Sequence, residues 1–263
     1  MKTVLSIAGS DSSGGAGIQA DIKTIAAHGL FAETAVTALT AQNTLGVAGV
    51  QNADPAFVAA QIDAVFEDIR PDAVKVGMVS SAGIIEAIAE RLRAWEARNV
   101  VVDPVMVATS GARLIDEEAV AALTGSLVPL ADVITPNLPE AAVLAGVPVE
   151  GDASMLEAAR LIAARAGGRT AVLVKGGHAQ GAADDVLVAP DGSHEWFRAP
   201  RIATRNTHGT GCTLSSAIAC GLAAGAPLAQ AVADAKAYVR GALSAGLDLG
   251  RGSGPLDHMW RYR

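Results

Sequence analysis

Residues 3–27 read TVLSIAGSDSSGGAGIQADIKTIAA, and this stretch decides the fold. It begins with an aliphatic run, Thr3–Ala8, passes through a loop of glycine and serine, and ends in a helical pattern, Ala16–Ala27. A buried strand, a glycine-rich loop and a helix in this order are typical of α/β proteins, whose ligands bind beyond the carboxyl ends of parallel strands. The sequence therefore predicts an α/β fold with a ligand site beside this loop.

The rest of the chain repeats the alternation of short apolar runs and helical stretches. The further predicted strands are Glu33–Leu39, Ala73–Val76, Val100–Asp103, Val133–Thr135 and Thr170–Lys175. The further predicted helices are Pro55–Glu67, Ala82–Ala97, Asp116–Leu127, Leu138–Ala145, Ser154–Ala166, Gly211–Ala224 and Leu228–Leu247. Val186–Ala189 and His194–Phe197 flank a turn signal and predict an antiparallel hairpin. Since no linker or repeat divides the chain, we expect residues 1–263 to form one domain around a mostly parallel sheet.

Composition excludes several classes of protein. With 51% hydrophobic and only 18% charged residues the chain is not disordered, and its apolar runs are too short to span a membrane. A net charge of −7 without any Lys/Arg cluster argues against nucleic-acid binding as the main task. Cys212 and Cys220 lie too far apart on one predicted helix for a disulfide, and the N-terminus lacks a secretory pattern, so we expect a cytoplasmic protein.

The 28 glycines, about one residue in nine, gather in segments that follow predicted strands. Gly15-x-Gly17-x-x-Ala20 matches a dinucleotide-binding fingerprint, and Glu33 would be the ribose acid. The polar loop before these glycines is longer than a Rossmann turn, which favours a loop that lets the backbone approach a small substrate. Asp21 would face the same cavity; the alternative is an exposed acid stabilised by the helix dipole. No Gly-Lys dipeptide occurs, so a Walker A loop is absent.

The second glycine-rich segment, residues 206–214, reads NTHGTGCTL and leads into a helix. Gly209 and Gly211 permit a turn whose N–H groups point the same way, and the helix start adds its positive end, so the segment predicts a phosphate site. At the first turn of that helix the dipole lowers a thiol pKa from about 8.5, which predicts a thiolate or general base at Cys212. The alternative is a small buried hydrophobe, as we interpret Cys220. We interpret His208 as structural.

Four further residues supply the charged and polar groups that phosphoryl transfer needs. Asn137 and Glu140 are three residues apart at a predicted helix start, where they would hold Mg²⁺ with the help of water or would form a capping box. Lys175 ends a strand beside two glycines and would neutralise phosphate oxygens. Asp103 is a second acid at the same edge of the sheet; it would serve the metal through water or cap its strand.

Six segments in this order resemble the hydroxymethylpyrimidine/phosphomethylpyrimidine kinase family of the ribokinase-like superfamily. They are Gly9–Asp21, Ala41–Thr44, Lys75–Met78, Thr135–Glu140, Lys175–His178 and Asn206–Thr213. The resemblance implies a ribokinase-like three-layer α/β/α fold with a mostly parallel central sheet and an antiparallel edge hairpin. It also implies ATP- and Mg²⁺-dependent phosphorylation of 4-amino-5-hydroxymethyl-2-methylpyrimidine to its monophosphate and then to the diphosphate, in thiamine diphosphate biosynthesis, by a homodimer.

The resemblance also assigns roles to residues of this chain. The pyrimidine pocket would be lined by Gly9, Asp21, Gln42, Met78 and Val105. The nucleotide and its Mg²⁺ would be held by Asn137, Glu140, Lys175, Thr207, Gly209 and Thr210. Gly209 to Cys212 would form the anion hole, Cys212 would accept the substrate hydroxyl proton, and Thr109–Arg113 would be a flap hinged at Gly111. The rivals are a pyridoxal or pyridoxine kinase, a non-catalytic nucleotide-binding regulator and an NAD oxidoreductase.

Overall fold

The computed structural model describes residues 1–106, 115–177 and 182–263. Within these ranges one nine-stranded sheet has the order β3-β2-β1-β4-β5-β6-β7-β8-β9. The strands are β1 (Thr3–Asp11), β2 (Phe31–Asn43), β3 (Gly46–Asn52), β4 (Ala73–Val76), β5 (Val100–Val102), β6 (Val133–Ile134), β7 (Ala171–Lys175), β8 (Asp185–Val188) and β9 (His194–Phe197). Strands β2, β1 and β4 to β7 run parallel, whereas β3, β8 and β9 pair antiparallel with their neighbours.

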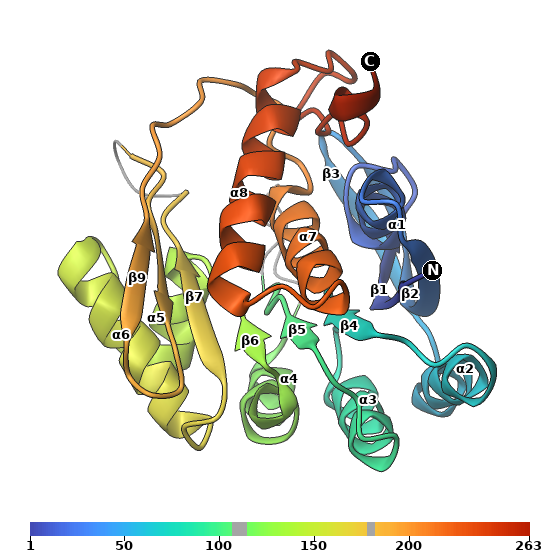
Figure 1. Ribbon diagram of the computed structural model, residues 1–263. Helices are drawn as coiled ribbons and strands as arrows, with labels where there is room; N and C mark the ends of the chain where they lie inside the picture. The colour runs from blue at the N-terminus through green and yellow to red at the C-terminus, as the bar shows by residue number, and fades with distance from the viewer. Residues whose placement is uncertain (107–114, 178–181) are drawn as a thin grey trace.

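Helices cover both faces of this sheet (Figure 1). They are α1 (Gly17–Ala27), α2 (Pro55–Asp68), α3 (Ala82–Ala94), α4 (Glu117–Ala122), α5 (Leu138–Ala145), α6 (Asp152–Arg165), α7 (Thr210–Ala223) and α8 (Leu228–Ser244). Helices α1, α7 and α8 lie on one face, and α2 to α6 lie on the other. The three-layer architecture and the antiparallel edge hairpin predicted from the sequence are therefore confirmed.

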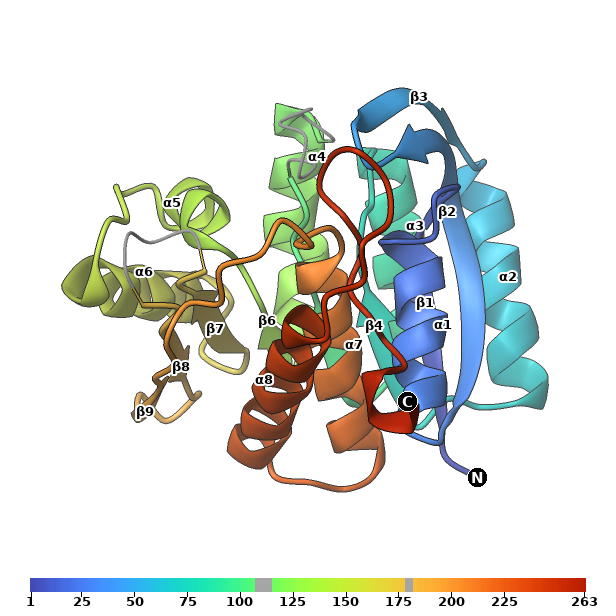
Figure 2. The ribbon, with the colours of Figure 1, turned by 90° about the horizontal axis from the view of Figure 1, so that it is seen from above.

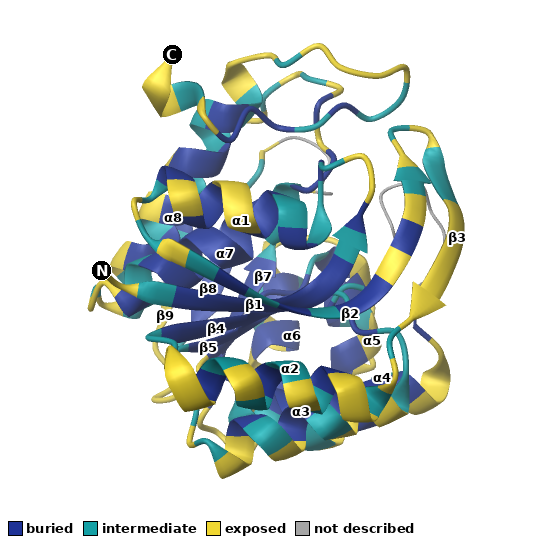
Figure 3. Cartoon of the chain, turned by 90° about the vertical axis from the view of Figure 1, so that its right-hand side faces the viewer, coloured by how far each residue is buried: buried dark blue, intermediate teal, exposed yellow. Residues whose placement is uncertain are grey.

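Alternation along β1 explains the two layers of helices. Val4 packs with the residues of α7 and α8 in one apolar cluster, while Leu5 and Ile7 pack with α2 and α3 in the other. Because both faces are covered, the central strands are dark blue, that is buried, in Figure 3. Helix α3 buries the single face that its four-residue spacing predicts, through Ile84, Ile88 and Leu92.

Two features differ from the sequence prediction. Strand β3 was not predicted, because its residues are mostly exposed and carry no alternating apolar pattern; it adds a second antiparallel edge. The helix predicted over Asp116–Leu127 is α4 followed by a π-helical turn, Leu123–Leu127. Within that turn the Thr124 hydroxyl donates to the Val120 carbonyl at 2.8 Å, and Gly125 supplies little helix propensity.

The order of the strands fixes where a ligand binds. The chain passes from β1 to β2 on one side and later returns to β4 on the other side of β1. Such a switch point opens a crevice beyond the carboxyl ends of the strands. The C-terminal segment after α8 crosses to the β2–β3 hairpin at this end, where the Ser253 N–H donates to the Thr44 carbonyl at 3.0 Å (Figure 2). Among the described helices, none is long and apolar enough to cross a membrane.

Candidate active site

The start of α7 forms the centre of the site. Gly209 precedes the helix with φ of +84°, a left-handed conformation, and a Cβ there would overlap the Gly15 carbonyl. The Thr213 hydroxyl donates to the Gly209 carbonyl at 2.8 Å, and the Thr210 hydroxyl donates to the Thr207 carbonyl at 2.7 Å. The loop is therefore fixed. The Thr210 N–H donates to the Thr207 carbonyl at 3.3 Å, and the Thr213 N–H donates to the Gly209 carbonyl at 2.9 Å. The N–H groups of Gly211 and Cys212 lie between these two in the first turn of α7 and are available to an anion.

Cys212 is the third residue of α7 and is partly buried. Burial raises the pKa of its thiol to about 11, while the Lys75 ammonium and the Gly17 backbone N–H lower it in part. The sequence predicted a lowered pKa from the helix dipole alone. That prediction is wrong for the free protein, because desolvation of the sulfur outweighs the helix end and the nearby cation.

Lys175, at the end of β7, pairs with Asp103, which follows β5. Their charged atoms lie 2.9 Å apart, and the Thr135 hydroxyl donates to the same Asp103 oxygen at 3.1 Å. A Cβ on Gly211 would lie 3.1 Å from Asp103 Oδ2 and 3.3 Å from Lys175 Nζ. Burial opposes the charge of Lys175, but Asp103 and Glu140 raise its pKa, so it remains a cation beside the start of α7.

Asn137 and Glu140 form the capping box of α5. Glu140 Oε2 accepts the Asn137 N–H at 2.8 Å, and Asn137 Oδ1 accepts the Glu140 N–H at 2.9 Å. Glu140 is only 4% exposed; burial raises its pKa to about 7, although Lys175 lowers it in part. The described residues contain no group of three His, Cys, Asp or Glu that could hold a metal ion. The described residues thus do not form a set of three such side chains that could bind Mg²⁺ directly. Asn137 and Glu140 do form the capping box that was the alternative interpretation.

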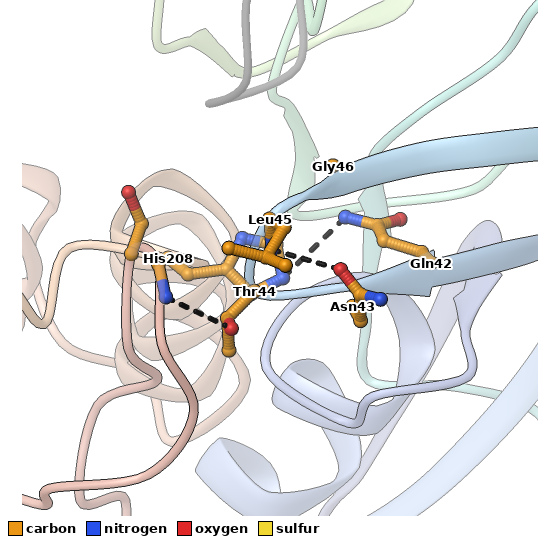
Figure 4. Close-up of a pocket in the computed structure, with 8 residues that line it drawn as sticks. Gln42, Asn43, Thr44, Leu45, Gly46 and His208 are labelled. Carbon is orange, nitrogen blue, oxygen red and sulfur yellow. Dashed lines mark hydrogen bonds between the residues drawn. The ribbon is translucent and has the colours of Figure 1, made fainter.

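A pocket of about 190 Å³ lies between the β2–β3 hairpin and the loop before α7 (Figure 4). Its lining residues are Gln42, Asn43, Thr44, Leu45, Gly46, His208, Gly252 and Ser253. The side chains of Gln42 and His208 point toward each other, with Nε2 atoms 3.4 Å apart. Of the five residues predicted for the pyrimidine pocket, Gln42 lines this one.

Met78 lines a second, wider cavity of about 770 Å³ together with residues of β3 and the start of α4, among them Asn52 and Asp116. Gly9 adjoins it: a Cβ there would lie 2.5 Å from Met78 Cε. Val105 follows β5 in a tight turn, its N–H donating to the Asp103 carbonyl at 2.8 Å. The flap predicted over Thr109–Arg113 lies outside the described residues.

Asp21 lies fully buried beneath the site, unlike either prediction for it. Its carboxylate pairs with Lys75 Nζ at 2.8 Å and accepts hydrogen bonds from the hydroxyls of Ser6 and Ser216. It is therefore not an exposed acid of the helix surface, and it is not among the residues that line the two pockets described above. The sequence analysis missed Lys75; the available signal was a lysine in the middle of a buried strand, Ala73–Val76.

Asp11 and His208 join the two glycine-rich loops. Asp11 Oδ2 accepts the N–H groups of Gly15 at 3.1 Å and Ala16 at 2.8 Å, and lies 2.7 Å from His208 Nε2. Burial opposes ionisation, but the hydrogen bonds from His208 and Ser13 hold the pKa of Asp11 well below its usual range. The structure gives His208 a tethering role, and Asp11 is a second residue that the sequence analysis missed.

This fold and site define an α/β kinase of small molecules of the ribokinase-like type: a helix start with free N–H groups, a lysine beside it and a pocket at the switch point of the sheet. The family model for phosphomethylpyrimidine kinase matches residues 11–257, and the chain belongs to that family. The predicted family, fold and enzyme class are therefore confirmed. The match favours the kinase over two of the alternatives, the NAD oxidoreductase and the non-catalytic regulator.

Similar proteins and solved structures agree with this family assignment. The chain is 53% identical to a hydroxymethylpyrimidine/phosphomethylpyrimidine kinase of Rhizobium meliloti, covering 98% of this chain and 97% of that protein. It is equally similar to a thiamine biosynthesis bifunctional protein of Geobacter sulfurreducens but spans only 52% of that relative. A phosphomethylpyrimidine kinase structure from Clostridium difficile matches with a TM-score of 0.81 at 44% identity, over 91% of this chain and 98% of that one. A Bacillus subtilis pyridoxal kinase with ADP matches with a TM-score of 0.91 at 36% identity, over 100% and 99%.

Proposed function

We propose that the chain transfers the γ-phosphoryl group of ATP to 4-amino-5-hydroxymethyl-2-methylpyrimidine, and then phosphorylates the monophosphate again to give the diphosphate used in thiamine biosynthesis. The observation that carries this proposal is the start of α7, where the Cys212 thiol, the N–H groups of Gly211 and Cys212 and the Lys175 ammonium converge. Membership of the phosphomethylpyrimidine kinase family supports the choice of substrate.

Phosphoryl transfer depends mainly on position and charge. In the proposed reaction the hydroxymethyl oxygen forms a bond to the γ-phosphorus, and the bond between the γ-phosphorus and the bridging oxygen breaks with its electron pair leaving on ADP. The hydroxyl proton passes to the sulfur of Cys212, which acts in its thiolate form and becomes the neutral thiol. The N–H groups from Gly209 to Cys212 stabilise the transferring oxygens, and Lys175 neutralises the nucleotide phosphates.

For the pyrimidine we propose a site formed by Gln42, Gly9, Met78 and Val105. The Gln42 amide both donates and accepts hydrogen bonds, which suits a ring nitrogen beside an exocyclic amine. Met78 and Val105 would supply apolar walls for the flat ring, and Gly9 would let the backbone approach it.

For the nucleotide we propose Thr207, Gly209, Thr210 and Lys175 as phosphate contacts. Mg²⁺ usually keeps several waters and takes one or two carboxylates besides the substrate phosphates. Glu140 fits this mode, since its buried carboxylate, with a pKa raised to about 7, would be stabilised as an anion by a cation. Glu140 and Asn137 would therefore hold the ion through water, with Asp103 nearby but paired to Lys175. When bound, the ion neutralises charge on the phosphate oxygens.

We propose that residues 1–263 act as a single kinase domain, supported by the single sheet of the described residues and by the extent of the family match.

We also propose a cytoplasmic homodimer. The free thiols Cys212 and Cys220 support a reducing compartment, and exposed apolar side chains on the β2–β3 edge, Leu39 and Val50, support self-association. Sedimentation should give a dimer that Leu39→Lys with Val50→Lys converts to a monomer; a wild-type monomer would refute it.

One assay tests the substrate. The protein is incubated with ATP and Mg²⁺ and with either the hydroxymethylpyrimidine or pyridoxal, and the products are separated by mass. We expect the mono- and diphosphate of the pyrimidine, formed at least about 100-fold more slowly by the Cys212→Ala variant. The similarity to pyridoxal kinases makes pyridoxal the proper competitor. Product from pyridoxal alone would overturn the proposed substrate.

A further inference from the structure

A fully buried ion pair lies against α7, the helix that carries Cys212, and the proposed reaction does not use it. Lys75 Nζ, from β4, lies 2.8 and 3.0 Å from the two carboxylate oxygens of Asp21, from α1, and both side chains are 0% exposed. Replacing a buried ion pair by apolar residues is often neutral or stabilising, so stability alone does not explain this pair.

The pair is held from three directions. The Ser6 hydroxyl of β1 donates to Asp21 Oδ2 at 2.6 Å, and the Ser216 hydroxyl of α7 donates to Asp21 Oδ1 at 2.8 Å. Each carboxylate oxygen thus accepts two hydrogen bonds. A Cβ on Gly77 would lie 2.5 Å from Lys75 Nζ, so the ammonium rests against backbone that carries no side chain. Both carboxylate oxygens of Asp21 are therefore fully engaged within the protein.

The pair faces the same side of α7 as the proposed base. Ser216, which bonds Asp21, is one helical turn after Cys212, so both side chains lie on one face of α7. The charges around Cys212 come from four segments. Lys75 of β4 favours the thiolate, Asp21 of α1 and Asp103 after β5 oppose it, and Lys175 of β7 also interacts with the thiol. Lys75 has the largest effect among the charges that act on the thiol, and it favours the thiolate.

We propose that Lys75 is a positioning residue that stabilises the Cys212 thiolate, with Asp21 holding its ammonium in place beneath the sulfur. This inference rests on the proposed function, since it concerns the group proposed to accept the substrate proton. Lys75 acts through Cys212 alone and does not contact substrate or nucleotide. The Lys75 ammonium thereby offsets part of the desolvation that burial imposes on the sulfur, while the Asp21 carboxylate opposes it.

The test measures thiolate reactivity without any substrate. Wild type and Lys75→Met are alkylated with iodoacetamide at pH 8, and labelling of Cys212 and Cys220 is followed separately by peptide mass. A thiol whose pKa lies well above the pH reacts through its small thiolate fraction, which falls about tenfold for each unit of pKa increase. A more basic thiolate is also more nucleophilic, so each unit of pKa increase slows alkylation by only about threefold. We expect labelling of Cys212 in Lys75→Met to be at least about threefold slower.

The sign of the change separates charge from structure. A variant that merely loosened the packing would expose Cys212 and speed its labelling, and would also expose Cys220, which is 1% exposed on the same helix. Ser6→Ala is the matched control, because it removes a buried hydrogen bond from the same network and leaves the ammonium; its Cys212 rate should stay near wild type. Equal slowing in Ser6→Ala, or an unchanged or faster rate in Lys75→Met with Cys220 protected, overturns the proposal.

A second variant covers the case in which Lys75→Met leaves Asp21 as a disruptive unpaired carboxylate. Lys75→Met with Asp21→Asn removes both charges and keeps acceptors and donors for Ser6 and Ser216. Because Asp21 opposes the thiolate less strongly than Lys75 favours it, Cys212 labelling should be slower than in wild type but faster than in Lys75→Met alone. If Cys220 becomes reactive in both variants, the pair is needed only for folding and the proposal fails. If Lys75→Met slows the labelling of Cys212 but the wild-type protein has no kinase activity, only the proposed function is refuted. If the wild-type protein transfers the phosphoryl group but Lys75→Met leaves the labelling of Cys212 unchanged, only this inference is refuted.

Discussion

Cys212 shows how one residue depends on its surroundings. As a free thiol at a helix start it would ionise readily, but burial raises its pKa to about 11. A base of this kind is strong once it is ionised, and its ionisation is favoured by neighbouring cations. The residue therefore suits proton abstraction from an alcohol better than reaction with oxidants, for which susceptibility follows thiolate character and exposure.

The first prediction concerns this thiol. Cys212→Ala should lower kcat by at least about 100-fold, within the range for loss of a general base. Cys212→Ser should do so as well, because a serine hydroxyl is a far weaker acid and its alkoxide is not available near neutral pH. Steady-state kinetics with the pyrimidine would measure this, with Cys220→Ala as the control that retains activity. A folded Cys212→Ala protein with near wild-type kcat would contradict the role of Cys212 as general base and would leave the anion hole as the only catalytic role of this segment.

Glu33 provides a prediction at the opposite end of the sheet from the site. It is 7% exposed in β2, and burial together with the nearby Asp72 raises its pKa to about 7. In the unfolded chain it ionises near pH 4.5, so between about pH 4.5 and 7 the folded protein holds a proton that the unfolded chain has released. Its contribution to stability therefore falls as pH rises through this window and stays low above it.

Glu33→Gln removes this ionisation. The variant should be more stable than wild type at pH 8, by on the order of 2 kcal/mol, and about equal at pH 4. Urea unfolding at the two pH values measures the difference, and Glu67→Gln, at an exposed position of α2, should change little at either. The same stability difference at pH 4 and pH 8 would show that Glu33 ionises normally in the folded protein.

At the scale of elements, local sequence signals predict the boundaries of some helices and strands but not of others. Helix α5 begins and ends where predicted, because Asn137, Glu140 and a left-handed Gly146 mark its two ends within the sequence itself. Strand β3 and the π-helical turn after α4 depend on pairing and packing with distant segments, so no local signal announced them.

The same distinction applies to the site. Gly209, Gly211 and Cys212 are adjacent in the sequence, so their role could be predicted from a short segment. The Lys75–Asp21 pair joins residues 54 positions apart, and its geometry depends on how β4 and α1 pack under α7. The pKa of Cys212 could not be predicted either, because it depends on the burial of the sulfur.

The two ends of α7 allow a matched test of the anion loop. Gly209 before the helix and Gly225 after it have φ of +84° and +85°, but only Gly209 has backbone, the Gly15 carbonyl, where a Cβ would lie. Gly225→Ala should cost roughly 1–2 kcal/mol of stability from the left-handed conformation, with activity retained. Gly209→Ala should cost more and should also lower kcat/KM by at least about tenfold, because the loop must shift. Thermal unfolding and kinetics of both variants measure this; equal effects would contradict it.

At the scale of the whole molecule, the site is assembled from segments at the two ends of the chain. The pocket that contains Gln42 is also lined by Gly252 and Ser253 of the C-terminal segment. This segment is held on both sides: Gly252 donates to the Thr44 hydroxyl at 3.2 Å, and the Gly254 carbonyl accepts the His208 N–H at 3.0 Å. One strap therefore bridges the tip of the β2–β3 hairpin and the loop before α7.

This arrangement predicts that the strap controls binding of the pyrimidine. A Cβ on Gly252 would overlap the Thr44 carbonyl, so Gly252→Ala must push the strap away from the hairpin. We expect KM for the pyrimidine to rise by about fivefold or more while KM for ATP changes little, because Lys175 and the start of α7 lie outside the strap contact. Gly49→Ala on β3, where a Cβ meets open space, should leave both constants near wild type. If Gly252→Ala raised both KM values equally, the strap would support the fold as a whole rather than the pyrimidine pocket.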